Sequence, residues 1–464
     1  MISNRYRDPI LSILYKGYVF FMPFSLFAVI PTDNMLVKYF FFSVSCVFLY
    51  LGLLHIVLSR QGRIVISPLL KRLVLLYCYM TVSSIVMAIL LYLPLGVKYG
   101  QTTFDCIPGD IIFYFVVLLN IYFNYYCLSF VVNFSELKKV FWVNIVILIL
   151  IGYIQLFVIY GGGVFVRIYQ SLSNIFYLYP VDRAREKGVT FFGSELSSAA
   201  QLFVIIIPFL CSVLLNKTEP LKWKRRAIFA LILFIPLFLN TSSSSVYITL
   251  ILVVATFISL SISIVGYRWI ILGGTIIGFG TVLIYGTNII NTISNTFDDG
   301  LGYIIIGKIF DVSNLSTAMR FSGMSMFIWI MLHFPLTGTG NGIQGFFYET
   351  NLQSWAYKSE EVKMVLSGVS GIPNGGGAFY TAYLTGYGII GLLALALFLR
   401  NYIRELKKKK SNLGYLYYLF LIGFAVFNFQ AWTVMGIKQD LSVIFLLSIP
   451  FVSDYNQNKS LKNS

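Results

Sequence analysis

The chain has 464 residues, of which 58% are hydrophobic and only 11% are charged, and its mean hydropathy is +0.81. Soluble domains carry about 25% charged residues, so this composition excludes an ordinary soluble protein and indicates a polytopic integral membrane protein. The net charge of +16 does not indicate nucleic-acid binding, because the basic residues are spread over short loops between apolar segments, as membrane topology produces.

The apolar segments predict an all-α fold in a single transmembrane domain, 1–464, with about 12 transmembrane helices, since a helical span needs roughly 20 apolar residues. Segments 227–240 and 440–453 are short, and to cross they need flanking residues or a thinned bilayer. The predicted segments are 10–30, 36–58, 73–95, 111–132, 140–160, 196–215, 227–240, 246–265, 269–288, 376–399, 413–431 and 440–453.

The distribution of lysine and arginine over the connections predicts the orientation. Of the 34 basic residues, 22 fall on the side of the N-terminus, 11 on the opposite side, and Lys16 within the first predicted span. The segments on the opposite side are longer and carry most of the acidic residues. Cytoplasmic loops carry the excess of basic residues, so both termini are predicted to be cytoplasmic. Two long connections, 161–195 and 289–375, then face outward.

The first outward loop ends in a run of cations that leads into the sixth predicted span. Arg185 presents a planar fork suited to phosphate oxygens, Gly188 lets the chain pass close to a ligand, and Glu195 could accept a proton from a sugar hydroxyl. In the alternative interpretation, Ser194 or Ser197 caps the helix, Glu195 complements its dipole, and the cations bind lipid head groups.

The second outward loop contains a short apolar run, Phe321–Leu332, which is too short to cross a bilayer and predicts a helix at the membrane interface. Arg320, just before this run, is a candidate phosphate ligand or a head-group anchor. His333, at its end, is a candidate acid, base or donor to an oxyanion, or else a neutral histidine with a backbone partner. Two glycine-rich runs follow, 338–342 and 375–377, where the backbone can bend or approach a ligand closely.

The five cysteines and two histidines indicate neither a disulfide framework nor a zinc site. Four of the cysteines lie in apolar segments, where packing explains them, and Cys106 stands alone in an outward loop. No phosphate-binding glycine loop and no nucleotide fingerprint occurs in the sequence. No metal and no cofactor is therefore expected.

Taken together, these features resemble the O-antigen polymerase (Wzy) and O-antigen ligase superfamily. The resemblance rests on twelve spans with enlarged outward loops after the fifth and ninth, and on the run from Arg185 and Gly188 to Glu195. It also rests on the distal loop, where Arg320 is followed by His-Phe-Pro-Leu-Thr-Gly-Thr-Gly-Asn-Gly (333–342), and on the stretch Gly-Tyr-Gly-Ile-Ile-Gly-Leu-Leu (386–393).

The resemblance implies a metal-independent membrane glycosyltransferase that uses glycans linked to undecaprenyl pyrophosphate, on the outer side of the bacterial plasma membrane. Arg185 and Arg320 would bind the pyrophosphate. The implied partners are the lipid-linked donor and acceptor, the bilayer, a chain-length regulator and a flippase.

Two departures favour the polymerase branch of this superfamily. Ligases carry a His-Asn pair ten and eleven residues before the first glycine of the Gly-x-x-Gly run, whereas Gly377 and Ala378 stand there in this chain, with Asn374 as an imperfect substitute. The Ser-Arg element that often opens the eighth span also lacks its arginine. Three functions stay open: a repeat-unit polymerase, a ligase-like transferase that uses the same donor, and a non-enzymatic flippase or transporter of lipid-linked oligosaccharides.

Overall fold

The computed structural model describes residues 8–24, 43–59, 66–176, 181–182, 188–191, 202–240, 244–262, 315–349, 352–368, 379–433 and 441–453. These residues form helices and their connections, and no β-strand is found among them apart from an isolated bridge between Lys98 and Gln101. The all-α prediction is confirmed for this part of the chain.

The helices of the first half are α1 (Pro9–Phe21), η1 (Met22–Phe24), α3 (Val44–Ser59), α4 (Pro68–Leu95), η3 (Thr103–Asp105), α5 (Cys106–Phe130), α6 (Phe134–Tyr160) and α7 (Gly163–Phe176). Those of the second half are α10 (Leu202–Leu215), α11 (Leu221–Leu239), α12 (Ser244–Ser261), α15 (Leu315–His333), η5 (Ile343–Phe347), η7 (Ala356–Lys358), α16 (Glu360–Leu366), α17 (Phe379–Lys408), α18 (Lys410–Leu413), α19 (Tyr415–Thr433), α20 (Leu441–Ser448) and η9 (Ile449–Phe451).

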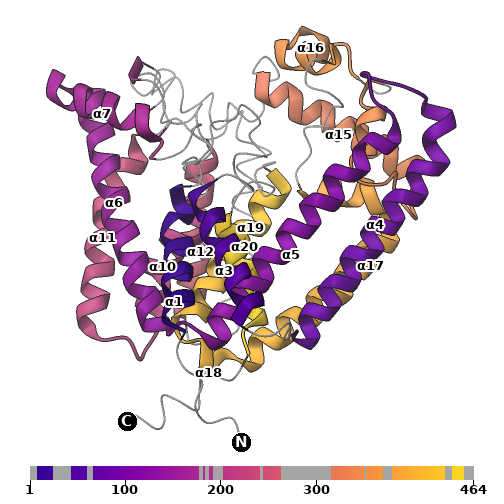
Figure 1. The fold of residues 1–464 in the computed structure, drawn as a ribbon. Helices are drawn as coiled ribbons and strands as arrows, with labels where there is room; N and C mark the ends of the chain where they lie inside the picture. The colour runs from indigo at the N-terminus through magenta and orange to yellow at the C-terminus, as the bar shows by residue number, and fades with distance from the viewer. Residues whose placement is uncertain are drawn as a thin grey trace, which may run out of the picture.

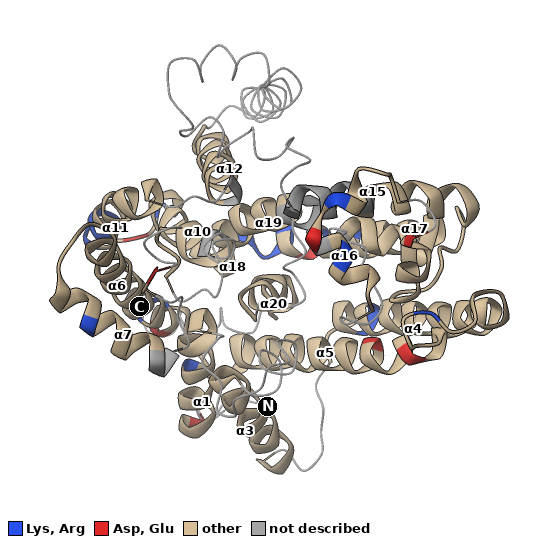
Figure 2. Ribbon diagram, turned by 90° about the horizontal axis from the view of Figure 1, so that it is seen from above, with Lys and Arg blue, Asp and Glu red and all other residues tan. Residues whose placement is uncertain are grey.

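Within the described chain, 4 stretches are long and apolar enough to cross a membrane: Pro68–Leu95, Thr103–Phe130, Phe134–Tyr160 and Tyr380–Lys408. Shorter apolar helices lie in most of the other predicted segments, and segment 269–288 lies outside the described residues. Seen along the helices, most of the ribbon carries no charged residue (Figure 2). An all-α membrane protein is therefore supported, whereas the number of 12 spans stays a prediction.

Several helices begin earlier than hydrophobicity alone predicts, because polar caps and not the first apolar residue set their starts. The Ser67 side chain accepts a hydrogen bond from Leu70 N at 3.1 Å, and Pro68 occupies the first turn of α4, where a missing N–H costs nothing. Asn133 caps α6 in the same way by accepting from Ser135 N at 3.1 Å.

The lysine-rich turns meet at one end of the fold. Lys138, at the start of α6, forms an ion pair of 2.6 Å with Glu219, before α11. The Tyr415 hydroxyl donates to Phe134 O at 2.9 Å, and Lys409 Nζ donates to Pro450 O at 3.0 Å. These bonds place turns that the sequence assigns to the cytoplasm side by side.

The described helices lie in two groups, and α5 contacts both (Figure 1). In one, α10 packs against α11, α12, α19 and α20, and α1 packs against α3 and α6. In the other, α4 packs against α5 and α17, while α15 packs against α16 and α17 at the end away from the lysine-rich turns. A separate small apolar core, which includes Met326, Ile330 and Phe346, fixes α15 over the end of α4.

Candidate functional site

The glycine-rich turn after α15 packs into a break in helix α17. At Gly388 the backbone of α17 is not helical, with φ 57° and ψ −157°. A break within an apolar helix leaves backbone groups without their usual partners, and inside a membrane these must be satisfied by the protein itself. Four hydrogen bonds do so: Thr339 N to Thr385 O (2.8 Å), Gly340 N to Gly386 O (2.9 Å), Ile389 N to Pro335 O (2.9 Å) and Ile390 N to Leu336 O (3.1 Å).

This contact requires glycine on both of its sides. A Cβ atom at Gly388 would lie 2.5 Å from the carbonyl carbon and oxygen of Leu336, and one at Gly338 would lie 2.5 Å from Thr385 O. Backbone atoms cannot move aside as the end of a side chain can. The turn 335–342 and the break in α17 therefore form one rigid unit.

A buried polar network lies beneath this turn and joins four parts of the chain. The Asn341 backbone N–H donates to Ser84 Oγ of α4 at 3.1 Å, and Asn341 Nδ2 donates to the Tyr114 hydroxyl of α5 at 3.2 Å. The hydroxyls of Tyr114 and Tyr387 are 2.5 Å apart. All four residues are buried. Polar groups in such surroundings are costly unless paired, so this network fixes the turn relative to α4, α5 and α17.

A tight turn between α4 and η3 carries a strained tyrosine next to the same region. Lys98 and Gln101 exchange two backbone hydrogen bonds of 3.0 Å, which leaves Tyr99 at φ 55°, a conformation that bulky residues rarely adopt. The Tyr99 hydroxyl is buried with no hydrogen-bond partner among the described residues. Burial, with the nearby charge of Glu349, raises the pKa of Tyr99 to about 12. The hydroxyl is therefore a donor and not a base at neutral pH.

Across the molecule, a buried glutamine holds the end of the first outward loop. Gln155 Oε1 accepts from Thr190 N at 3.1 Å and from Phe191 N at 2.8 Å, and Gln155 Nε2 donates to Phe191 O at 2.8 Å. Val189 N donates to Asn240 O, at the end of α11, at 2.8 Å. The segment 188–191, which starts at Gly188 (φ 99°), is therefore anchored to α6 and α11.

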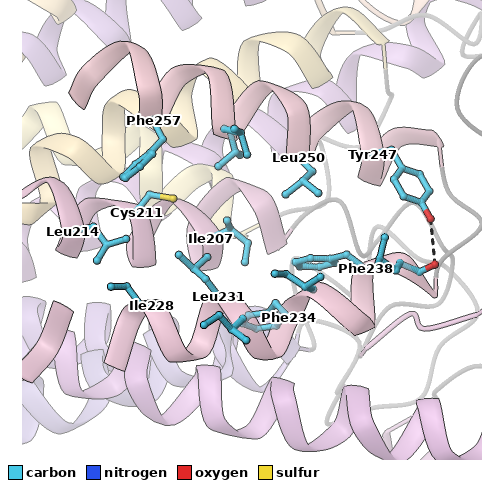
Figure 3. A pocket seen from close by; sticks show the side chains of 15 residues that line it. Ile207, Cys211, Leu214, Ile228, Leu231, Phe234, Phe238, Tyr247, Leu250 and Phe257 are labelled. Atoms are coloured by element: carbon cyan, nitrogen blue, oxygen red, sulfur yellow. Dashed lines mark hydrogen bonds between the residues drawn. The ribbon is translucent and has the colours of Figure 1, made fainter. Parts of the chain in front are cut away.

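An apolar groove ends at Leu239, the neighbour of Asn240 (Figure 3). It lies between α10, α11 and α12 and encloses about 370 Å³. The Tyr247 hydroxyl, at one end of the groove, donates to Leu239 O at 3.3 Å, and Leu239 directly precedes Asn240. The groove is lined by Ile207, Cys211, Leu214, Ile228, Leu231, Ile232, Phe234, Ile235, Phe238, Leu239, Tyr247, Leu250, Val253, Val254 and Phe257.

Most of the predicted site residues are not tested by this geometry. Arg185, Glu195 and Asn374 lie outside the described residues. Arg320 does not precede the helix as predicted but lies inside α15, which begins at Leu315. The prediction placed the start at Phe321, whereas residues 315–319, directly before Arg320, also adopt helical backbone. Whether Arg185 and Arg320 share one site stays a prediction.

His333 is exposed at the end of α15. Its Nδ1 lies 2.8 Å from Trp329 O, and its ring stacks on the Trp329 ring with centroids 4.0 Å apart. Because a carbonyl oxygen can only accept, Nδ1 donates its proton in this hydrogen bond. The backbone partner expected in the alternative interpretation is thus present, and the catalytic role of His333 stays a prediction.

Sequence reasoning missed Gln155, Asn341, Ser84, Tyr114 and Tyr387. A signal was available for some of them, since polar side chains inside apolar spans are rare and face the protein interior.

No family model matches the sequence, and no curated protein matches it. In the described part of the chain, no three His, Cys, Asp or Glu side chains gather as metal ligands would.

Proposed function

We propose that the chain is a membrane-embedded glycosyltransferase that polymerises oligosaccharide repeat units linked to undecaprenyl pyrophosphate. It would act at the outer face of the bacterial plasma membrane. The observation that carries the proposal is the apolar groove between α10, α11 and α12, whose end lies next to the anchored segment 188–191. A hydrocarbon chain fits a groove of this composition, and the head group of such a lipid would lie beside the segment that follows Arg185.

The distance along the chain agrees with this role for Arg185. Arg185 lies three positions before Gly188, and a fully extended stretch of that length spans at most about 11 Å. An arginine side chain adds further reach, and its planar fork matches phosphate oxygens. Arg185 can therefore act on an anionic group held at the end of the groove.

In the proposed reaction, a hydroxyl oxygen of the acceptor repeat unit bonds to the anomeric carbon of the donor glycan. The bond between that carbon and the pyrophosphate oxygen breaks, and its electrons leave with undecaprenyl pyrophosphate. Arg185 and Arg320 stabilise the departing charge, and the hydroxyl proton passes to a base, the role we assign to Glu195. His333, about 20 Å along α15 from Arg320, lines the rim of the site. The reaction uses no metal ion and no cofactor.

The contact between the turn 335–342 and the break in α17 gives further support. These two stretches carry the resemblance to the polymerase and ligase superfamily in the second half of the chain, and they hydrogen-bond directly to each other. Residues that a family uses together are expected to lie together, and a rigid scaffold of this kind suits a site that must hold two sugars in a fixed orientation.

One observation favours the alternative of a flippase. Broken helices near the middle of the membrane are typical of transporters, whose unwound carbonyls coordinate ions or substrate. Helix α17 is broken at Gly388. Here, however, the carbonyls of Thr385 and Gly386 accept hydrogen bonds from the turn, which makes the break a packing site and favours the transferase.

Gene deletion tests the proposal through the surface glycan. A polymerase mutant carries single repeat units on its surface, whereas a ligase mutant accumulates long chains that are not attached to their final acceptor, and a flippase mutant carries neither. The second arm uses the purified chain with radiolabelled lipid-linked repeat units. A ladder of longer lipid-linked products supports the polymerase, and unchanged substrate with repeat units moved across the bilayer refutes it.

A further inference from the structure

A second groove lies near the lysine-rich end of the fold, far from the outward segments. Helices α1, α3 and α6 form it, and it encloses about 400 Å³. Its lining combines six apolar or glycine positions with two cations: Ile13, Gly17, Phe20, Phe48, Val140, Val143, Lys16 and Lys139. Ile13 and Val143 are exposed, so the groove opens on the surface that faces lipid.

Gly17 lets the Phe48 side of the groove lie close to α1. A Cβ atom at this position would lie 2.7 Å from the Phe48 ring, so that ring packs directly against the backbone of α1. Phe48 also stacks on Phe21, with ring centroids 5.7 Å apart. The apolar wall is therefore held in place by the helices themselves and does not depend on a bound ligand.

The two lysines of the groove remain accessible to a ligand. Lys16 forms an ion pair of 2.7 Å with Glu136, and both side chains remain about one-third exposed, at 34% and 28%. Lys139 is exposed and has no ion pair among the described residues. The neighbouring Lys138 differs, since its pair with Glu219 is buried. Lys16, Lys139 and Glu136 together leave a net positive charge at the groove.

The positions of these groups along the helices match the chemistry of a phospholipid. Lys16 lies seven residues into α1 and Lys139 five residues into α6, which places both roughly 8–11 Å from the helix starts at 1.5 Å per residue. Phe20 and Val143 follow one turn further along. A phosphate at the two ammonium groups would therefore continue into an acyl chain along the apolar wall.

We propose that this groove binds an anionic phospholipid. Basic pockets between transmembrane helices favour anionic head groups, and a zwitterionic lipid would bring its own ammonium group toward Lys139. The site is separate from the proposed transferase site and does not depend on that function. Its occupant would tie α1, α3 and α6 together, since each of these helices contributes to the lining.

The test uses the delipidated full-length chain in detergent, with binding of phosphatidylglycerol and phosphatidylcholine followed by native mass spectrometry and thermal unfolding. We expect wild-type protein to prefer phosphatidylglycerol by roughly tenfold or more. The double variant Lys16→Gln/Lys139→Gln should lose this preference. The matched control, Lys71→Gln/Lys222→Gln, removes two exposed lysines outside the groove and should keep it.

A second variant tests the apolar wall without touching the charges. Val143→Trp fills the groove while both lysines remain, so it should weaken phosphatidylglycerol binding. Equal affinity for the two lipids in wild-type protein, or equal loss in both double variants, would overturn the proposal. Stabilisation by inorganic phosphate as strong as that by phosphatidylglycerol would also overturn it, because it would identify a site for a free anion.

Discussion

Gly388→Ala tests whether the break in α17 is a built structural feature. The methyl group would meet the Leu336 carbonyl at 2.5 Å, and the residue would keep φ 57° and ψ −157°, a region that only glycine occupies readily. The backbone strain costs about 1–3 kcal/mol, and overpacking against atoms that cannot yield costs about 1–3 kcal/mol more. We therefore expect a loss of roughly 2–6 kcal/mol of unfolding free energy.

Thermal unfolding of the purified protein in detergent measures this decrease in stability. It is monitored as the disappearance of the monodisperse peak in size-exclusion chromatography. A shift of several degrees is expected, since about 1 kcal/mol lowers Tm by 2–4 °C in chains of 150–250 residues and by less in longer ones. Gly386→Ala is the matched control, because its nearest atom is 3.4 Å away and its φ is ordinary. Gly109→Ala, with nothing within 4 Å, is a second control. Wild-type Tm in Gly388→Ala would refute the reasoning.

Three further predictions concern the outward segments. Gln155→Leu leaves the Thr190 and Phe191 N–H groups without their buried acceptor and should cost about 2–6 kcal/mol at 1–3 kcal/mol per group. The exposed Gln170→Leu should change Tm little, and an equal shift in both variants would contradict the assignment. Tyr99→Phe removes a buried hydroxyl without a partner in the described chain and should stabilise the protein by about 1 kcal/mol. Because the folded pKa of Tyr99 is about 12 against 10.0 for a free tyrosine, the unfolding free energy of the wild type should fall as the pH rises from 10 toward 12. Tyr99→Phe lacks this titrating group, so its stability should fall less over the same range, and parallel curves for the two proteins would contradict the assignment. Arg185→Lys should abolish polymer formation nearly as fully as Arg185→Ala, since a point charge cannot replace the fork; normal polymer in the lysine variant, at equal protein level, would indicate a head-group anchor instead.

The sequence predicts which segments are helical better than where they end. Hydrophobicity identifies the apolar stretches, and the capped starts of α4 and α6 could have been found from Ser67-Pro68 and Asn133. Helix α7 was not predicted, although Val164, Phe165 and Ile168 recur at helical spacing within the first outward loop. Spans are identified by the length of their apolar runs, and a short amphipathic helix such as α7 has no such run.

The break in α17 could not be predicted in the same way. Glycines at 386, 388 and 391 stand in a run that is otherwise an ordinary apolar span, and glycine is common in membrane helices. The cause of the break is the turn 335–342, which lies about fifty positions earlier. Likewise, the bond from Asn341 to Ser84 joins residues 257 positions apart. Such contacts depend on the tertiary packing and leave no periodic pattern in the sequence.

The anchoring of both predicted outward segments fits the proposed transferase better than the alternative of a transporter. Catalysis of group transfer depends on donors held in position before the reaction begins, whereas alternating access requires one part of the fold to move against another. The segment 188–191 is tied down by the hydrogen bonds of Gln155, and the turn 335–342 by its four backbone bonds and the glycine contact with α17. A gate at either place would have to break several of these bonds at once, although the polar side chains of Gln155, Thr190 and Thr339 are buried. A fixed binding site for a pyrophosphate needs such rigid neighbours. The segment 188–191 follows Arg185 in the sequence, and the turn 335–342 follows the helix that carries Arg320.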